Sequence, residues 1–318
     1  MAKLLSIIIP VHNEEANIPL IYQAVKAQFS KLGDDFNYEI IFVDDGSTDQ
    51  SSAEVASIGD NDRQVKLIEF SRNFGKEVAT TAGLTEALGD AAIIIDADLQ
   101  HPPELIPEFI NRWLKGFDMV VGVRNNNETE GIVKRLGSIA FYKAMNLIGE
   151  TKLASRTTDY RIIDRQVIEE FKRFTEHNRM TRGLLDWLGF KKDYLYFTAQ
   201  PRRHGKASYS KLKLIKLALS TFVSHSLFPL KFAGYLGIFI VAISGPLGLL
   251  IFIDKYILHD ATGLNFSGPA ILALVNMFFT GIILSSLGLI AFYIADIQSE
   301  VVNRPIYVVR NRKNFNQK

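Results

Sequence analysis

Five short apolar runs in the first 125 residues alternate with helical patterns, and this alternation constrains the fold more than any other feature. The runs are rich in isoleucine and valine, and they are Leu4–Ile9, Glu39–Val43, Val65–Phe70, Ala91–Ile95 and Met119–Val123. Helical patterns such as Ile18–Leu32 and Glu77–Leu88 lie between them. Strands that are apolar on both faces and alternate with helices predict an α/β fold, with a mostly parallel sheet covered by helices on both sides.

Polar turns follow these runs, and they predict where a ligand binds. In a parallel sheet, ligands bind outside the carboxyl ends of the strands. The turns at that edge are "PVHNEE", "VDDGSTD", "FSRNFGKE" and "DADLQH". The chain contains neither a G-x-G-x-x-G nor a Walker A sequence, which argues against dinucleotide and P-loop sites. It has no cysteine, which excludes disulfides, thiolate zinc sites and cysteine nucleophiles.

Two long uncharged stretches, Phe232–Ile253 and Ser267–Ala295, set the second half of the chain apart. Each exceeds the roughly 20 residues that a helix needs to cross a bilayer. The alternative is a pair of buried helices in a large soluble domain, but long helices that are apolar on every face need lipid around them. Basic residues flank the stretches on their outer sides, whereas the connection Asp254–Phe266 has only Lys255. The positive-inside rule therefore places both chain ends in the cytosol of a two-span membrane protein.

The segment before the first stretch is amphipathic. Within residues 208–226, leucine, isoleucine and phenylalanine share one helical face, and lysine and serine share the other. This pattern predicts a helix that lies in the membrane interface; the alternative is a helix packed on its own domain. The expected organisation is a cytosolic catalytic domain at 1–207, the interfacial helix at 208–226, two transmembrane helices within 227–295 (about 229–253 and 269–295), and a cytosolic basic tail at 296–318.

Two aspartates, Asp96 and Asp98, follow an apolar strand in "DADLQ". Carboxylates one residue apart on a strand-end turn can face the same point and hold a hard divalent cation. Such a cation stabilises the negative charge that develops on a diphosphate leaving group. The alternative is that Asp98 caps a helix that begins near Pro102. The pair is therefore the candidate metal site and part of the candidate catalytic site.

The neighbouring turns offer groups for a nucleoside. Asp44 and Asp45 in "VDDGSTD", and Asn13 and Glu14 in "PVHNEE", can accept hydrogen bonds from a base N–H or from ribose hydroxyls. A plain strand-to-helix turn is the alternative for "VDDGSTD", although two successive aspartates exceed what a cap requires. Further substrate-binding candidates in or beside these loops are Pro10, Lys76, Gln100 and Arg124.

A basic cluster, Arg202, Arg203, His204 and Lys206, lies between the expected catalytic domain and the amphipathic segment. It has two interpretations. One is general attraction to anionic lipid. The other is a clamp for an acceptor phosphate and a donor diphosphate, because arginine suits bidentate phosphate contacts.

The motifs "SIIIPVHNEE", "VDDGSTD", "NFGKE" and "DADLQHPPE", in this order, resemble glycosyltransferase family 2, which has the GT-A fold. "TTDYRIIDR" and "PRRHGKASYSKLKL", followed by two uncharged stretches, narrow the resemblance to its polyisoprenyl-phosphate glycosyltransferases. These include dolichol-phosphate mannose synthase and bacterial undecaprenyl-phosphate glucosyltransferases. The chain departs from many relatives by having Arg156 and Thr158 where they have aspartate and glycine.

The resemblance implies a nucleotide-sugar donor, a polyprenyl-phosphate acceptor, and Mg²⁺ or Mn²⁺. It implies that Asp45 and Glu14 contact the nucleoside and that Asp96 and Asp98 hold the metal and diphosphate. Asp159 and Arg161 would belong to the acceptor-side loop. Asp159 is then a candidate base or orienting group, unless it only pairs with Arg161 or Arg202.

The expected reaction is transfer of a hexose, glucose from UDP-glucose, to undecaprenyl or a related polyprenyl phosphate by inverting single displacement. Other donors, including those of mannose and aminoarabinose, are alternatives. A processive polysaccharide synthase is disfavoured because the chain lacks Q-x-x-R-W. A non-catalytic membrane scaffold is disfavoured by the intact aspartate pairs. We expect the bilayer but no nucleic acid as a partner, and a symmetric homo-oligomer such as a tetramer, because two isolated spans pack well against copies of themselves.

Overall fold

The computed structural model describes residues 2–125, 157–176, 180–198 and 304–315, together with scattered positions between 253 and 302. The chain divides into two units. The first comprises Met1–Asn146, Thr151–Ser208 and Asn303–Lys318, and the second comprises Leu147–Glu150 and Tyr209–Val302. The strands and helices named below belong to the first unit.

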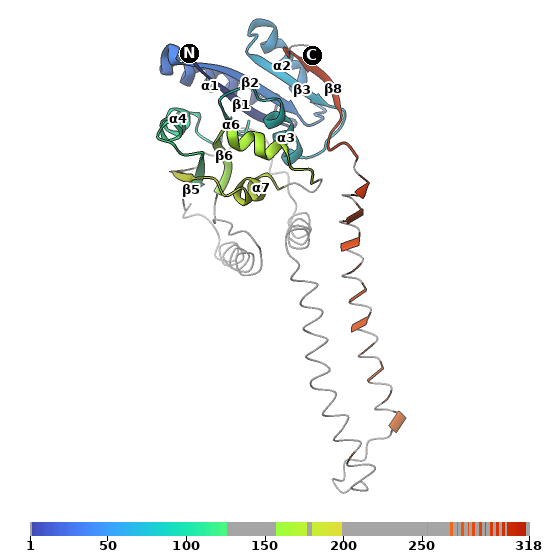
Figure 1. Ribbon diagram of the computed structural model, residues 1–318. Coiled ribbons are helices and arrows are strands. Elements are labelled where there is room, and N and C mark those ends of the chain that lie inside the picture. The colour runs from blue at the N-terminus through green and yellow to red at the C-terminus, as the bar shows by residue number, and fades with distance from the viewer. Residues whose placement is uncertain are drawn as a thin grey trace. The chain divides into compact units, whose positions relative to one another are not determined.

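The described part of the first unit is built on an eight-stranded sheet in the order β7-β5-β6-β4-β1-β2-β3-β8 (Figure 1). The strands are β1 Lys3–Val11, β2 Phe36–Asp44, β3 Val65–Phe70, β4 Ala91–Ile94, β5 Met119–Arg124, β6 Thr157–Asp164, β7 Lys192–Phe197 and β8 Val309–Lys313. Only β6 and β8 run antiparallel to their neighbours; the other strands of this sheet share one direction. The predicted mostly parallel sheet is confirmed.

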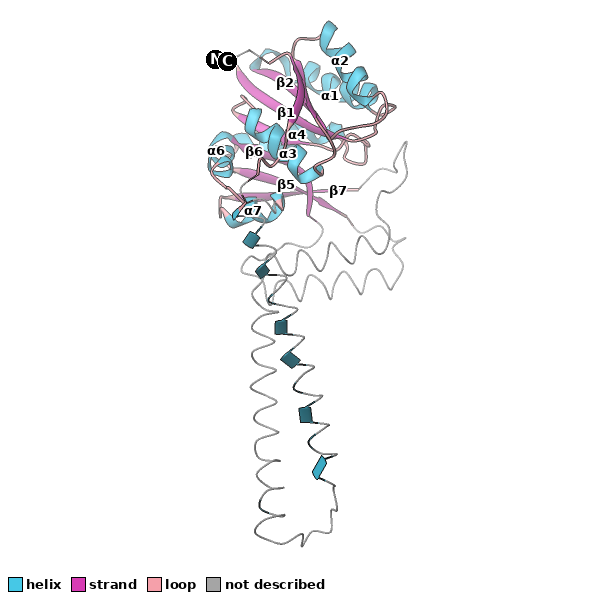
Figure 2. Ribbon diagram, turned by 90° about the vertical axis from the view of Figure 1, so that its right-hand side faces the viewer, coloured by secondary structure: helices cyan, strands magenta, loops and turns pink. Residues whose placement is uncertain are grey.

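Helices cover both faces of this sheet (Figure 2). They are α1 Ile18–Leu32, α2 Ser51–Asn61, α3 Lys76–Glu86, α4 Ile106–Leu114, α6 Arg165–Lys172 and α7 Thr181–Trp187, with short 3-10 turns at Gly33–Asp35 and Pro103–Leu105. In β1, Ile7 and Ile9 pack in one core with α1 and α4, whereas Ile8 packs in the other core with α3 and α6. Because successive side chains of a strand point to opposite faces, a continuous apolar run places β1 between two helix layers.

Several elements begin and end where the sequence predicts. β3 matches Val65–Phe70 and α1 matches Ile18–Leu32 exactly in their bounds. α3 starts at Lys76, one residue before the predicted start, and ends at Glu86. Lys76 is therefore the first residue of a helix whose position is set by its packing on the sheet.

α3 approaches β1 closely. A Cβ atom at Gly83 would lie 2.3 Å from the Cγ2 atom of Ile8, so a larger residue there would force the two elements apart. Gly75, just before the helix, has φ +104°, a left-handed conformation that glycine adopts without steric cost. Together these glycines allow α3 to start at the carboxyl end of the sheet, where the polar loops lie.

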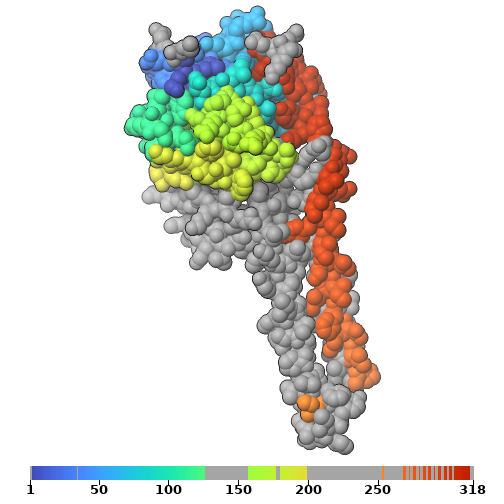
Figure 3. All heavy atoms as spheres, in the orientation of Figure 1, coloured from blue at the N-terminus to red at the C-terminus, as the bar shows by residue number. Residues whose placement is uncertain are grey.

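The C-terminal segment adds a strand that the sequence analysis had assigned to a basic tail. β8 pairs antiparallel with β3, and the N–H of Ser71 donates to the carbonyl of Val308 at 2.9 Å. The rings of Tyr307 and Phe70 stack with their centroids 4.9 Å apart. β8 therefore belongs to the same sheet as the N-terminal strands, and residues 304–315, red in Figure 3, belong to the same unit.

The predicted membrane segments lie almost entirely outside the described residues. The predicted interfacial helix at 208–226 is outside them, and so is the predicted span at about 229–253 except for Ile253. Within the described part of the chain, no helix has both the length and the apolar character needed to cross a bilayer. The described positions from Gly268 to Val301 are helical. The large exposed apolar side chains among these described positions are Leu272, Val275, Phe279, Ile283, Leu287, Ile290, Ile294, Ile297 and Val301.

Candidate active site

The loops after β1 and β2 are tied to each other by their own polar side chains. Asn13 has φ 56°, and its side-chain oxygen accepts the N–H of Thr48 at 2.8 Å. The Glu14 carboxylate accepts from the Asn17 amide at 2.5 Å, and the Glu14 N–H donates to the Ser51 hydroxyl. Pro10 is buried within β1, where it pairs with Val43 of β2. The nucleoside contacts of Pro10, Asn13 and Glu14 stay predictions.

The two aspartates of "VDDGSTD" accept hydrogen bonds from groups within the protein. Asp44 accepts the N–H and the hydroxyl of Ser47 and so closes its own turn. Asp45 accepts the N–H of Phe74 at 2.6 Å and that of Gly75 at 2.9 Å. Burial raises the pKa of both carboxyls, although these hydrogen bonds oppose the rise. The turn thus does more than connect a strand to a helix, because Asp45 holds the loop that leads into Lys76.

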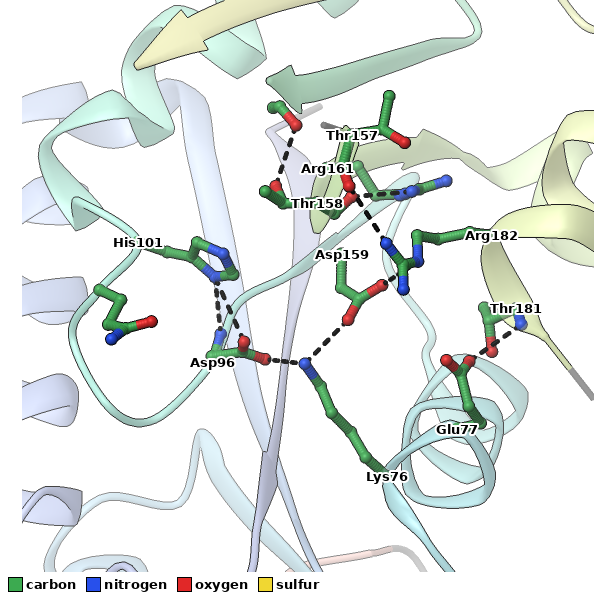
Figure 4. A network of polar contacts seen from close by, with 12 residues as sticks. Lys76, Glu77, Asp96, His101, Thr157, Thr158, Asp159, Arg161, Thr181 and Arg182 are labelled. Atoms are coloured by element: carbon green, nitrogen blue, oxygen red, sulfur yellow. Dashed lines mark hydrogen bonds and ion pairs between the residues drawn. The ribbon is translucent and has the colours of Figure 1, made fainter. Parts of the chain in front are cut away.

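Lys76 lies at the centre of the site, between carboxylates from two different strand ends (Figure 4). Its Nζ atom is 2.6 Å from Oδ1 of Asp96, which follows β4, and 2.8 Å from Oδ2 of Asp159 in β6. On the other side of Asp159, Nε of Arg182 in α7 lies 3.1 Å from Oδ1. Two carboxylates and two cations therefore form one chain of ion pairs.

Each charged group in this row of ion pairs stabilises the charged form of its neighbours. Burial alone would raise the pKa of Asp96 and of Asp159, but the neighbouring cations outweigh it. Lys76 lowers the pKa of Asp96, and Lys76 together with Arg182 holds the pKa of Asp159 well below its usual range. Burial lowers the pKa of Lys76, but the two carboxylates raise it above its usual value. All of these groups are therefore charged near neutral pH.

The rest of the "DADLQH" loop is ordered by local contacts. Oδ1 of Asp98 accepts the N–H of Gln100 at 3.1 Å, and neither the 3-10 turn that begins at Pro103 nor α4 has a side-chain cap. The alternative of Asp98 as a helix cap is therefore wrong. The side-chain oxygen of Gln100 accepts from Arg124 at 3.4 Å, which joins this loop to the end of β5.

Arg161 and Thr158 have structural roles beside Asp159. Arg161 is fully buried in β6, and its Nη2 atom donates to the carbonyl of Thr158 at 2.8 Å. The Thr158 hydroxyl donates to the carbonyl of Gly122 in β5 at 2.9 Å. Asp159 thus pairs with Lys76 and Arg182 rather than with Arg161. Arg202, Arg203 and Lys206 lie outside the described residues, so the proposed phosphate clamp stays a prediction.

Sequence reasoning missed two side chains of this site. Arg182 lies in the short helix α7, and no local spacing connects it to Asp159, which precedes it by 23 positions. Only the tertiary structure brings the two together. His101 was visible in "DADLQH" but was given no role. It is buried and stacks on Tyr160, with ring centroids 5.2 Å apart, and its Nδ1 atom lies 3.7 Å from Asp96. Burial lowers its pKa, so the imidazole is neutral near pH 7.

The site suits a divalent metal that also has ligands outside the protein. The carboxylate of Asp96 already contacts one cation, the ammonium of Lys76, and Asp98 follows it by two positions in the same loop. Carboxylate oxygens are the ligands that Mg²⁺ and Mn²⁺ prefer. In the described ranges, no group of three or more histidine or acidic side chains could enclose a metal. In proteins, Mg²⁺ is commonly held by one or two carboxylates and completed by substrate phosphates.

Comparison with known proteins adds a family. A model described as "Glycosyl transferase family 2" matches residues 6–172. The uncharacterized glycosyltransferase YkcC of Bacillus subtilis is 38% identical and covers 96% of this chain and 93% of its own length. The bactoprenol glucosyl transferase of Shigella phage SfV is 36% identical and covers 97% of this chain and 99% of its own length. Among solved structures, mannosyltransferase PcManGT from Pyrobaculum calidifontis, in complex with GDP-Man and Mn²⁺, is 15% identical, covers 96% of this chain and 89% of its own, and has a TM-score of 0.48.

Proposed function

The chain belongs to glycosyltransferase family 2, and from that premise we propose that it transfers glucose from UDP-glucose to a polyprenyl phosphate such as undecaprenyl phosphate. Its mostly parallel α/β sheet is the GT-A fold that the sequence resemblance implied. Relatives named bactoprenol glucosyl transferase, which align over nearly the whole chain, support the choice of sugar and acceptor.

The observation that carries the proposal is the chain of ion pairs through Lys76. Asp96 from one strand end and Asp159 from another meet one ammonium, and Arg182 completes the set. A transferase that moves a sugar from a nucleoside diphosphate to a lipid phosphate must balance several phosphate charges next to carboxylates. Lys76 and Arg182 supply cations for the phosphates, while Asp96 and Asp98 supply oxygen atoms for a divalent metal.

We propose that Mg²⁺ or Mn²⁺ binds at Asp96 and Asp98 together with the donor diphosphate. When bound, such a metal supplies positive charge that stabilises the departing nucleoside diphosphate. Asp96 is half-buried and Asp98 is largely buried, so the oxygens are shielded from bulk water and their charges act strongly. The Asp45 hydrogen bonds to Phe74 and Gly75 keep the start of α3 in place beside these carboxylates.

Asp159 acts as an orienting group in this proposal. Its pKa lies well below the usual range because of Lys76 and Arg182, which makes its carboxylate a weak base. A lipid phosphate needs no strong base, since its second pKa is about 6 and it is already anionic near neutral pH. A single displacement at the anomeric carbon, with inversion, is then the simplest reaction.

We further propose that two membrane spans and an interfacial helix hold the active site at the cytosolic face of the cell membrane. The apolar side chains described between Leu272 and Val301 support this, because large exposed apolar patches mark protein or membrane interaction sites. The basic residues Arg202, Arg203 and Lys206 would then meet the acceptor phosphate close to the bilayer. A symmetric homo-oligomer, such as a tetramer, completes the proposal.

A donor panel tests this function. Purified full-length protein is incubated with undecaprenyl phosphate and a series of UDP- and GDP-sugars, with divalent metal or with excess chelator. We expect a glucosylated lipid from UDP-glucose with metal and none with chelator. A product formed only from a mannose or aminoarabinose donor would show that the sugar is wrong, and no lipid-linked product from any donor would favour a non-catalytic role.

A further inference from the structure

The Lys76 ammonium contacts an oxygen of Asp96, one of the two carboxylates that would hold the proposed metal. Its ammonium is 2.6 Å from Oδ1 of Asp96 and 2.8 Å from Oδ2 of Asp159 (Figure 4). A divalent cation that uses Oδ1 of Asp96 and an ammonium at hydrogen-bond distance from the same oxygen repel each other strongly. A metal that binds Oδ1 of Asp96 therefore requires the ammonium to move away from that oxygen.

The backbone around Lys76 is fixed, whereas its side chain has room to move. The N–H groups of Phe74 and Gly75 are held by Asp45, and Gly83 locks α3 against Ile8. The Lys76 side chain is nevertheless 40% exposed. A lysine carries its charge on a flexible four-carbon stem, so its ammonium can shift by several ångströms while the helix stays in place.

The charges indicate where the ammonium goes. In the structure, two carboxylates, Asp96 and Asp159, are balanced by two cations, Lys76 and Arg182. A nucleotide sugar brings one negative charge on each of its two phosphates, and a divalent metal brings two positive charges. The metal and donor together add no net charge, so the site still needs the charge of Lys76. The donor phosphates provide a new partner for it within the site.

We propose that Lys76 is a displaceable counter-cation: it neutralises Asp96 while the donor is absent, and it moves to the donor diphosphate when metal and donor bind together. This inference rests on the proposed function, because that function supplies the metal and the diphosphate. It implies that free metal binds weakly until a diphosphate is present. Metal and nucleotide would then favour each other's binding, and Lys76 would provide much of the coupling.

Mn²⁺ binding, measured by electron paramagnetic resonance on the purified full-length protein, tests this inference without any sugar transfer. In the parent protein, we expect weak Mn²⁺ binding alone and clearly tighter binding with UDP. Lys76→Met should bind Mn²⁺ alone about tenfold more tightly than the parent, because typical coupling between sites is about 5–150-fold. UDP should increase the Mn²⁺ affinity of this variant by a smaller factor than that of the parent. Adding Asp96→Asn to Lys76→Met should remove the gain.

Lys192→Met is the matched control. Lys192 pairs with Asp186 at 2.6 Å, the same distance as Lys76 and Asp96, but it lies at the start of β7. This variant should bind Mn²⁺ as the parent does. Lys76→Gln repeats the test with a polar side chain if Lys76→Met fails to fold.

Two results would overturn the inference: no gain in Mn²⁺ affinity in either neutral Lys76 variant, or an equal gain in Lys192→Met. Failure of the proposed function would look different. The parent would then form no lipid-linked sugar, while the Mn²⁺ affinities of the Lys76 variants could still show the predicted order.

Discussion

Asp159 is held between Lys76 and Arg182, and this position limits its chemistry. Its pKa is depressed, so the carboxylate is ionised throughout the neutral range. This depressed pKa also sets the direction in which folding stability depends on pH. Stability from these ion pairs is present above the ordinary pKa of 3.8 and is lost only as the pH falls toward the depressed value. Stability should therefore not vary between about pH 6 and 9 through this group.

The first prediction concerns the role of this carboxylate. Asp159→Asn should raise the acceptor KM and leave kcat within about tenfold, because an orienting group mainly affects binding. A true general base would contribute about 10²–10⁴-fold to kcat. The measurement is kcat and KM for undecaprenyl phosphate between about pH 6 and 9. A collapse of kcat at unchanged KM, relieved at high pH, would identify a base and contradict the orienting role.

The second prediction concerns the metal carboxylates. Asp96→Asn and Asp98→Asn should each lower kcat by about 10²–10³-fold, since each removes charge that would hold the metal at the leaving diphosphate. Glu169→Gln is the control: this acid lies in α6, more than half exposed, and pairs only with Arg165 and Lys172 among its described ion-pair partners. It should keep full activity. Full activity of the parent in excess chelator would refute metal dependence.

At the residue scale, the sequence identified the carboxylates but not their partners. Asp96 and Asp98 could be singled out because two charges directly follow an apolar strand. The partners of Asp159 could not be identified in this way, because Lys76 and Arg182 come from helices in different parts of the chain. Ion pairs between distant segments leave no periodic signal in a single sequence.

At the scale of secondary structure, the central elements were predictable, whereas three strands, β6, β7 and β8, were not. β1, β2, β3 and β4 are buried on both faces, so their apolar runs stand out. β8 is an edge strand with the sequence VRNRK and is mostly exposed. Its charged side chains give no apolar strand pattern, so the sequence predicts only a basic tail there. β6 contains a buried Arg161 and was considered only as a motif loop.

The third prediction tests the packing of α3 on β1. Gly83→Ala should destabilise the protein by about 1–3 kcal/mol, because the new methyl group meets the branched, buried side chain of Ile8. Gly183→Ala in α7 is the matched control, since its Cβ has no neighbour closer than 3.8 Å. That variant should be neutral or slightly stabilised. Thermal unfolding of both variants checks this, and equal stability of Gly83→Ala and the parent would contradict the close contact.

At the scale of the whole molecule, β8 limits how often the chain can cross a membrane. Because β8 is hydrogen-bonded to β3, residues 304–315 lie on the same side of any membrane as residues 2–125. The chain between them must then cross an even number of times. This argument is independent of the positive-inside rule, and it agrees with the two spans that we propose.

The fourth prediction follows from this constraint. In sealed right-side-out vesicles, tags at the N-terminus and at Lys318 should both be protected from an impermeant reagent. A cysteine placed at Gly263, in a chain that has no other cysteine, should react with an impermeant thiol reagent. Labelling at Lys318 without labelling at Gly263 would show that the orientation is wrong.

The most direct test of the central claim is the anomeric configuration of the lipid product formed from UDP-glucose and undecaprenyl phosphate by the purified protein with Mn²⁺. UDP-glucose has the α configuration, and a single displacement by the lipid phosphate inverts it. Nuclear magnetic resonance of the product should therefore show only β-linked glucosyl phosphate. An α-linked product would contradict the single displacement, and the absence of any glucosyl lipid would contradict the assigned reaction itself.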